Sequence, residues 1–149
     1  DKRVKGIFPT AFNNLNIAVQ VETSLSFGDF SRSIDEYVQR GILDDLNNPE
    51  KLDLLEYIDL SPTDLYRNFK AIVVGTNDPY WPIDSANLYI KELPGCSSMV
   101  YAPNAGHGAE VFRVSQAISS MIHHLNTGEP LSSMSYVEEQ SEGTLKVRT

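Results

Sequence analysis

The stretch that decides the fold is FKAIVVG at residues 69–75, which is followed by the loop TNDPYWP at residues 76–82. A continuous apolar run that ends at glycine is typical of a strand buried on both faces of a parallel sheet. A second strand is predicted for SMVYA at residues 98–102, and the loop NAGHG at residues 104–108 comes after it. Two strands that each run into a polar loop indicate an α/β protein with its chemistry in those loops.

Each of these loops leads into an expected helix. The first helix is predicted over residues 83–93, where Pro94-Gly95 stops it. The second is predicted from about residue 109 to residue 125, because its apolar positions recur at helical spacing. Right-handed crossovers then bring both loops to the carboxyl edge of one parallel sheet, where α/β proteins place their sites.

The N-terminal part predicts one short strand and a mainly helical insertion. The strand is expected over residues 4–8, and the insertion over residues 10–68. Within the insertion, residues 34–40 predict a short helix, and Pro49 starts a second one. The residues expected on the buried face of this second helix are Leu52, Leu55, Tyr57 and Ile58.

The composition changes after Asn126, and this change predicts a domain boundary. Residues 1–126 form the α/β part, and residues 127–149 are expected to be a linker followed by a β-hairpin. A lone hairpin is marginally stable in water, so we expect it to begin a β region that continues elsewhere.

Asp78 and His107 are the candidate catalytic residues, because each lies just past one of two neighbouring strands. An aspartate in this place can accept the Nδ1–H of the histidine, which leaves Nε2 free to take a proton from a serine. In α/β-hydrolases the chain order is nucleophile, acid, histidine, so Asp78 and His107 fit the last two members. The serine is then expected in a glycine-bracketed turn before residue 4, outside this chain.

Other interpretations of the same residues stay open at this stage. Asp78 can be a turn former, and His107 can cap the following helix. Tyr80 and Trp81 either pack the loop or form a wall of a substrate pocket. The serines of the chain follow no strand and open no helix through a glycine turn, so none is expected to be the nucleophile. The acidic residues of the insertion predict a solvated face, with the alternative that one or two meet a cationic substrate group; they are Asp35, Glu36, Asp44, Asp45, Glu50, Asp53 and Glu56.

The composition excludes several classes of function. Twenty acidic residues against 12 basic ones give a net charge of −8, which disfavours binding to nucleic acid and to anionic membranes. No apolar run is long enough to span a membrane. His123 and His124 are expected at the surface, and no residue cluster predicts a metal or other cofactor. The single cysteine, Cys96, cannot form an internal disulfide.

Several stretches together resemble one known family. They are DKRVKGIFP at residues 1–9, NLN at residues 14–16, GTNDPYW at residues 75–81 and YAPNAGH at residues 101–107. On these motifs the chain resembles the PhoPQ-activated pathogenicity-related family, which includes secreted proteins of the autocrine proliferation repressor protein A type. The resemblance implies an α/β-hydrolase fold related to serine peptidases, and it assigns Asp78 and His107 to the acid and base positions.

The function expected from these observations is that of a serine hydrolase of peptidase type, in which this chain supplies the aspartate and the histidine. Its partners would be the N-terminal half of the same hydrolase domain and a peptide or ester substrate. The resemblance also leaves a second interpretation, a secreted non-catalytic signalling protein that engages a cell-surface receptor. A secreted or periplasmic location is implied by the resemblance alone. A third interpretation is a small self-contained α/β module.

Overall fold

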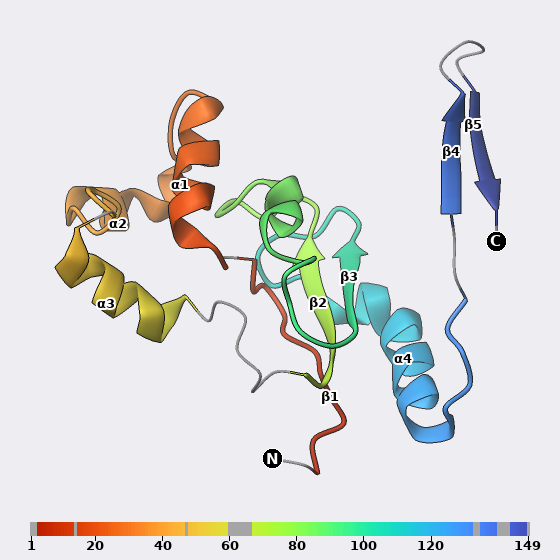
Figure 1. Ribbon diagram of the computed structural model, residues 1–149. Helices are drawn as coiled ribbons and strands as arrows, with labels where there is room; N and C mark the ends of the chain where they lie inside the picture. The colour runs from red at the N-terminus through yellow and green to blue at the C-terminus, as the bar shows by residue number, and fades with distance from the viewer. Residues whose placement is uncertain are drawn as a thin grey trace. The chain divides into compact units, whose positions relative to one another are not determined.

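The protein is described here by a computed structural model of residues 3–13, 15–46, 48–59, 67–132, 135–139 and 144–148 (Figure 1). The chain divides into two compact units, Asp1–Gln116 and Ala117–Thr149. The sequence places its domain boundary at residue 126 instead, and that division stays a prediction. Of the described residues, none belongs to a helix long and apolar enough to cross a membrane.

A three-stranded parallel sheet is the centre of the first unit. Its order is β1 (Gly6–Ile7), β2 (Phe69–Gly75) and β3 (Ser97–Ala102). Both pairings are parallel, and Gly75 at the end of β2 pairs with Ala102 at the end of β3. Every residue of β2 is buried, as its apolar residues predicted, and Lys70 is buried with them. The sheet and the helices beside it confirm the α/β class.

The core of this unit lies on the face of the sheet that carries Ile72 and Val74. These two side chains pack with Leu15, Ala86 and Tyr89, all at most 5 % exposed. The hydroxyl of Tyr89 donates a hydrogen bond of 2.9 Å to the side-chain oxygen of Asn13, which satisfies both polar groups inside the core. Burial raises the pKa of Tyr89 well above its usual value.

Between β1 and β2, the described residues form the α-helices α1 (Ile17–Ser26), α2 (Asp35–Gln39) and α3 (Pro49–Ile58). A short 3-10 helix, η1 (Arg32–Ile34), precedes α2. One expectation for this region is wrong, because Tyr57 is 83 % exposed and does not belong to a buried face. Leu52, Leu55 and Ile58 were predicted for the same face, and their side chains are not among those that the structure describes.

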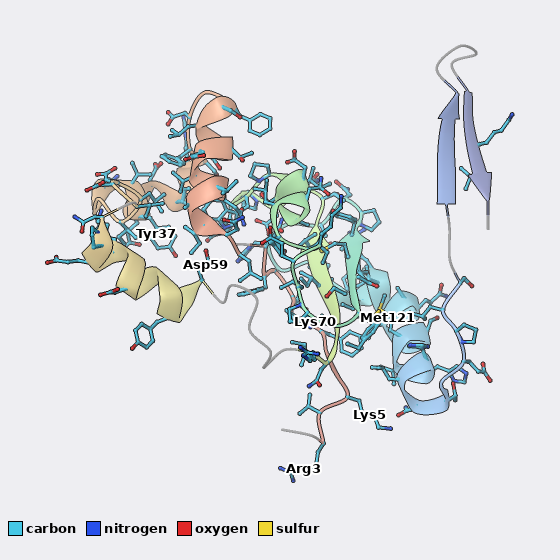
Figure 2. The ribbon with its side chains drawn as sticks, in the orientation of Figure 1. Arg3, Lys5, Tyr37, Asp59, Lys70 and Met121 are labelled. Carbon is cyan, nitrogen blue, oxygen red and sulfur yellow. The ribbon has the colours of Figure 1, made fainter. Side chains whose placement is uncertain are left out.

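Helix α1 is a helix that the sequence did not predict, and its start explains why. Asn16, the residue before it, donates its backbone N–H to the carboxylate of Asp59 at 2.8 Å, and Ile17 does the same at 2.7 Å (Figure 2). A carboxylate suits the positive end of a helix, but this one comes from far along the chain. Asn16 occupies the N-cap position in a left-handed conformation and its side chain makes no capping hydrogen bond, so the helix start depends on the distant Asp59 instead.

The two helices expected after the strands are shorter or begin later than predicted. Residues 83–88 form a 3-10 helix, η3 (Ile83–Leu88), and turns follow it up to Pro94. After His107, Ala109 and Glu110 adopt left-handed backbone angles, with φ of 50° and 39°, which an α-helix does not accommodate. The chain therefore forms the 3-10 helix η4 (Val111–Val114) before α4 (Ser115–Thr127) begins.

The end of the second unit contains an antiparallel hairpin of β4 (Ser135–Glu139) and β5 (Thr144–Arg148). Ser135 pairs with Arg148 and Glu139 pairs with Thr144. These are the strands that the sequence predicted after the linker.

The Tyr89–Asn13 hydrogen bond can be tested by pH-dependent unfolding. In Tyr89→Phe, the buried oxygen of Asn13 loses its donor, and we expect the free energy of unfolding to fall by about 1–3 kcal/mol at neutral pH. The wild type should lose further stability as pH rises above about 10, because the unfolded chain ionises Tyr89 before the folded chain does. The variant should lack this part of the alkaline loss.

Denaturant titrations at several pH values measure both effects. Tyr57→Phe is the matched control, because Tyr57 is 83 % exposed and its hydroxyl should contribute little to stability. Equal unfolding free energies for Tyr89→Phe and Tyr57→Phe at all pH values would contradict the assignment.

Candidate active site

The carboxyl ends of the three parallel strands lie at one edge of the sheet. Past β1, Ala11 donates its backbone N–H to the carbonyl of Val73 at 2.8 Å, so this segment continues along β2. Gly75 and Ala102 end the other two strands side by side. Three loops therefore begin together, and two of them are those that carry the candidate residues.

A set of hydrogen bonds joins the loop after β2 to the loop after β3. Asn77 donates its backbone N–H to the carbonyl of Ala105 at 2.9 Å, and its side-chain amide donates to the side chain of Asn104 at 2.8 Å. In the opposite direction, the backbone N–H of Asn104 donates to the Thr76 hydroxyl at 2.8 Å. These bonds hold the two loops in one arrangement.

Gly75 allows this approach. A Cβ atom at this position would overlap the carbonyl oxygens of Ala105 and Gly106, so a residue with a side chain does not fit between the two loops. Backbone atoms cannot give way as a flexible side chain can. The absence of a side chain at Gly75 is thus a requirement of the loop crossing.

Asp78 and His107 meet at this edge of the sheet. The Nδ1 atom of His107 lies 2.9 Å from Oδ2 of Asp78. The other carboxylate oxygen, Oδ1, accepts the backbone N–H of Tyr80 at 2.9 Å, so both oxygens of Asp78 have partners. The Asp78 side chain is 9 % exposed, whereas that of His107 is 47 % exposed. A mostly covered carboxylate thus holds an accessible imidazole.

The hydrogen bond determines which nitrogen of His107 is available for chemistry. A carboxylate only accepts, so Nδ1 carries the proton, and Nε2 has a free lone pair in the neutral ring. The ring of Tyr80 lies against the imidazole, with centroids 4.1 Å apart and planes inclined by 39°. Within the described part of the chain, no hydroxyl forms a hydrogen bond with Nε2. The arrangement can therefore accept a proton from a group that approaches from outside these residues.

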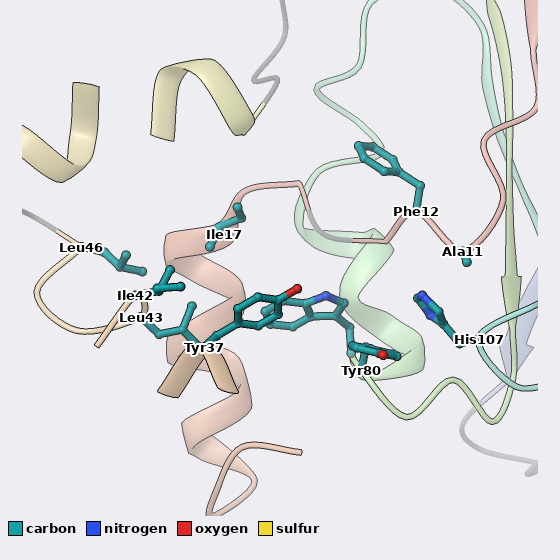
Figure 3. Close-up of a pocket in the computed structure, with 10 residues that line it drawn as sticks. Ala11, Phe12, Ile17, Tyr37, Ile42, Leu43, Leu46, Tyr80 and His107 are labelled. Carbon is teal, nitrogen blue, oxygen red and sulfur yellow. The ribbon is translucent and has the colours of Figure 1, made fainter. Parts of the chain in front are cut away.

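The two aromatic residues that the sequence singled out, Tyr80 and Trp81, line a cavity of about 440 Å³ together with His107 (Figure 3). The same two residues line a second, shallower cavity of about 330 Å³, in which Asp78 also takes part. Tyr80 and Trp81 therefore contribute to the walls of both cavities. A role of these residues in binding substrate stays a prediction.

Sequence reasoning missed the other walls of the larger cavity. Ala11 and Phe12 come from the segment past β1. Had β1 been predicted to pair in parallel with β2, the sequence would have placed these two residues at the same edge of the sheet. The helical insertion supplies the remaining walls, through residues whose position no local pattern indicated: Ile17, Tyr37, Ile42, Leu43 and Leu46. The insertion therefore forms part of the cavity that His107 lines.

The remaining candidates have other surroundings. Nε2 of His123 lies 3.1 Å from the carboxylate of Glu129, and Nδ1 of His124 donates a hydrogen bond to the Glu129 carbonyl, both within the second unit. Among the described residues, no three His, Cys, Asp or Glu side chains come together as a metal would require. Cys96 is a free, exposed thiol.

The fold and the site define an α/β protein with an Asp–His pair at the carboxyl edge of a parallel sheet. The family described as PhoPQ-activated pathogenicity-related protein matches residues 1–149, and the chain belongs to this family. It is also similar to autocrine proliferation repressor protein A of Dictyostelium discoideum, at 23 % identity over 155 aligned positions. This similarity covers 97 % of the chain and 31 % of the relative, so the chain spans about a third of that protein's length. No solved structure gives a significant match.

The loop crossing at Gly75 can be tested by two alanine substitutions. Gly75→Ala should lower the free energy of unfolding by about 1–3 kcal/mol or more, because its Cβ meets backbone oxygens that cannot move independently. Gly106→Ala is the matched control in the facing loop, since a Cβ there meets no atom within 4 Å.

Thermal and denaturant unfolding of the two variants measure the difference. NMR chemical shifts of the His107 ring should change in Gly75→Ala and stay close to wild type in Gly106→Ala. A Gly75→Ala variant as stable as wild type, with an unshifted His107 ring, would show that the crossing is not a constraint.

Proposed function

We propose that this chain supplies the acid and base residues of a hydrolase site on an α/β-hydrolase scaffold, with a peptidase-type activity. The observation that carries the proposal is the 2.9 Å contact between His107 Nδ1 and Asp78 Oδ2 at the carboxyl edge of the sheet. In such a site the aspartate orients the imidazole and stabilises its protonated form, and the histidine acts as general base.

The chain order supports a serine nucleophile in particular. Aspartate precedes histidine, as in the nucleophile–acid–histidine order of α/β-hydrolases. Our proposal places the serine elsewhere in the full-length protein, in a turn that presents its hydroxyl to His107 Nε2. The 47 % exposure of the His107 side chain leaves room for such an approach.

The proposed reaction proceeds in two steps, the acylation of the serine and the hydrolysis of the acyl-enzyme. The serine oxygen attacks the substrate carbonyl while its proton passes to His107 Nε2, and the imidazolium then gives this proton to the departing amine or alcohol as the acyl bond breaks. Water next attacks the acyl-enzyme and transfers a proton to Nε2, which returns it to the serine as the carboxylic acid leaves. Asp78 stays ionised throughout and stabilises the charged imidazole.

A second candidate function rests on the name of the similar Dictyostelium protein, an autocrine proliferation repressor. On this alternative the full-length protein is a secreted signalling protein, and the Asp–His pair has only a structural role. The same fold can support either function, so the site itself has to be tested.

The test uses the full-length protein and a fluorophosphonate probe, which labels an activated serine. We expect His107→Ala to abolish labelling, because no base remains to take the serine proton. Asp78→Asn should slow labelling by about 10³- to 10⁴-fold, since the amide no longer selects the reactive tautomer. His123→Ala is the matched control, and it should label at the wild-type rate.

Two outcomes distinguish the candidate functions. Labelling that is unchanged in His107→Ala removes the catalytic role of this residue. If the full-length protein is never labelled, but a protein with both Asp78→Asn and His107→Ala still represses proliferation, the signalling function is favoured instead.

A further inference from the structure

We propose that the cavity beside His107 binds an uncharged apolar side chain of the substrate, aromatic or aliphatic, next to the bond that is cleaved. This inference rests on the proposed hydrolase function and adds the substrate class to it. It starts from the 440 Å³ cavity that His107 and the helical insertion line together.

The chemistry of the cavity walls favours an apolar occupant. None of the described residues that line the cavity is an Asp, Glu, Lys or Arg, and its one basic side chain is that of His107. The insertion contributes mainly aliphatic surface through Ile17, Ile42 and Leu46. Burying a charged group against such walls without a partner costs several kcal/mol, whereas burying apolar surface is favourable.

The acidic residues of the insertion do not change this conclusion. Asp35, Glu36, Asp44 and Asp45 are all exposed, and none of them lines the cavity. Glu36 forms an ion pair with Arg40 one helical turn away. A cationic substrate group in the cavity would therefore meet none of these carboxylates, and the solvated-face interpretation of the acidic residues is the better supported one.

The shape of the cavity gives the bound group a direction. In Figure 3, His107 and Tyr80 lie at one end of the lining, Ile42 and Leu46 lie toward the other, and Tyr37 stands between them. With the reacting carbonyl at His107, the adjacent side chain would extend past Tyr37 toward Leu46. A volume of 440 Å³ lies in the range of small-molecule sites and accommodates a leucine or phenylalanine side chain.

Ile42 and Tyr37 are the positions at which this preference can be altered. Ile42 is 44 % exposed and Tyr37 is 45 % exposed, so a charged residue at either position can be introduced without opening the core. Both residues line the cavity, whereas Val38, on the same short helix as Tyr37 and 36 % exposed, does not. Val38→Glu is thus a control of equal chemistry outside the cavity.

The first experiment measures kcat/KM of the full-length protein for p-nitrophenyl esters of N-acetyl-phenylalanine, N-acetyl-leucine, N-acetyl-lysine and N-acetyl-glutamate. We expect the phenylalanine and leucine esters to exceed the lysine and glutamate esters by about 100-fold. Ile42→Glu should reduce the ratio of kcat/KM for the phenylalanine ester to that for the lysine ester by about 10-fold or more. Tyr37→Lys should reduce the corresponding ratio for the glutamate ester by a similar factor. Val38→Glu should leave all four ratios unchanged.

The second experiment measures binding without any reaction, so that it is independent of the proposed catalysis. Calorimetric titration with the amides of N-acetyl-phenylalanine and N-acetyl-lysine should show tighter binding of the phenylalanine amide, weakened in Ile42→Glu and not in Val38→Glu. Thermal melts check that each variant is folded. If Ile42→Glu does not fold, Tyr37→Lys replaces it as the cavity variant in this titration.

The outcomes of the two experiments separate the inference from the proposed function. Apolar binding that depends on Ile42 or Tyr37, in a protein that cleaves no ester and takes no fluorophosphonate label, supports the cavity and contradicts the hydrolase. The opposite outcome is labelling that depends on His107 in a protein that prefers the lysine or glutamate ester, or that binds neither amide measurably. This result overturns the inference about the cavity and leaves the proposed hydrolase function intact.

Discussion

The close crossing of two loop backbones at Gly75 is the constraint on which the geometry of the site depends. Parallel pairing ends β2 and β3 at the same level, and the glycine lets the carbonyls of Ala105 and Gly106 pass over the end of β2. The hydrogen bonds of Asn77 and Asn104 then fix the distance between the loops. Only after these backbone constraints are met does a 2.9 Å bond between the Asp78 and His107 side chains become possible.

The cavity is built by two structures with different properties. The sheet edge supplies His107 and the aromatic residues of the loop after β2, on a backbone held by strand pairing and loop hydrogen bonds. The helical insertion supplies the apolar wall opposite, and the Ser31 hydroxyl connects it to the carbonyl of Pro79 beside Asp78. Chemistry and shape are thus provided by separate segments of the chain.

The parts that could be predicted from the sequence are those with a local signal. The apolar run of β2 and its terminal glycine indicated a buried parallel strand, and the order of Asp78 and His107 after two such strands indicated their meeting. Helix α1 could not be predicted, because its start is stabilised by Asp59 from a distant segment. The exposure of Tyr57 likewise depends on tertiary context, which helical spacing does not indicate. The late start of α4 follows from the left-handed backbone of Ala109 and Glu110 after His107, which the spacing does not indicate either.

The contact of Asp59 with the backbone of Asn16 and Ile17 also has a consequence for the strands on either side of the insertion. It joins residues 16 and 17 to residue 59, across 43 and 42 positions of the chain, and so closes most of the insertion into a loop. Closing a longer or shorter loop changes its entropic cost only slowly with length. A change in the length of this closed segment therefore leaves the register of the strands on either side, and with it the Asp–His pair, largely unaffected.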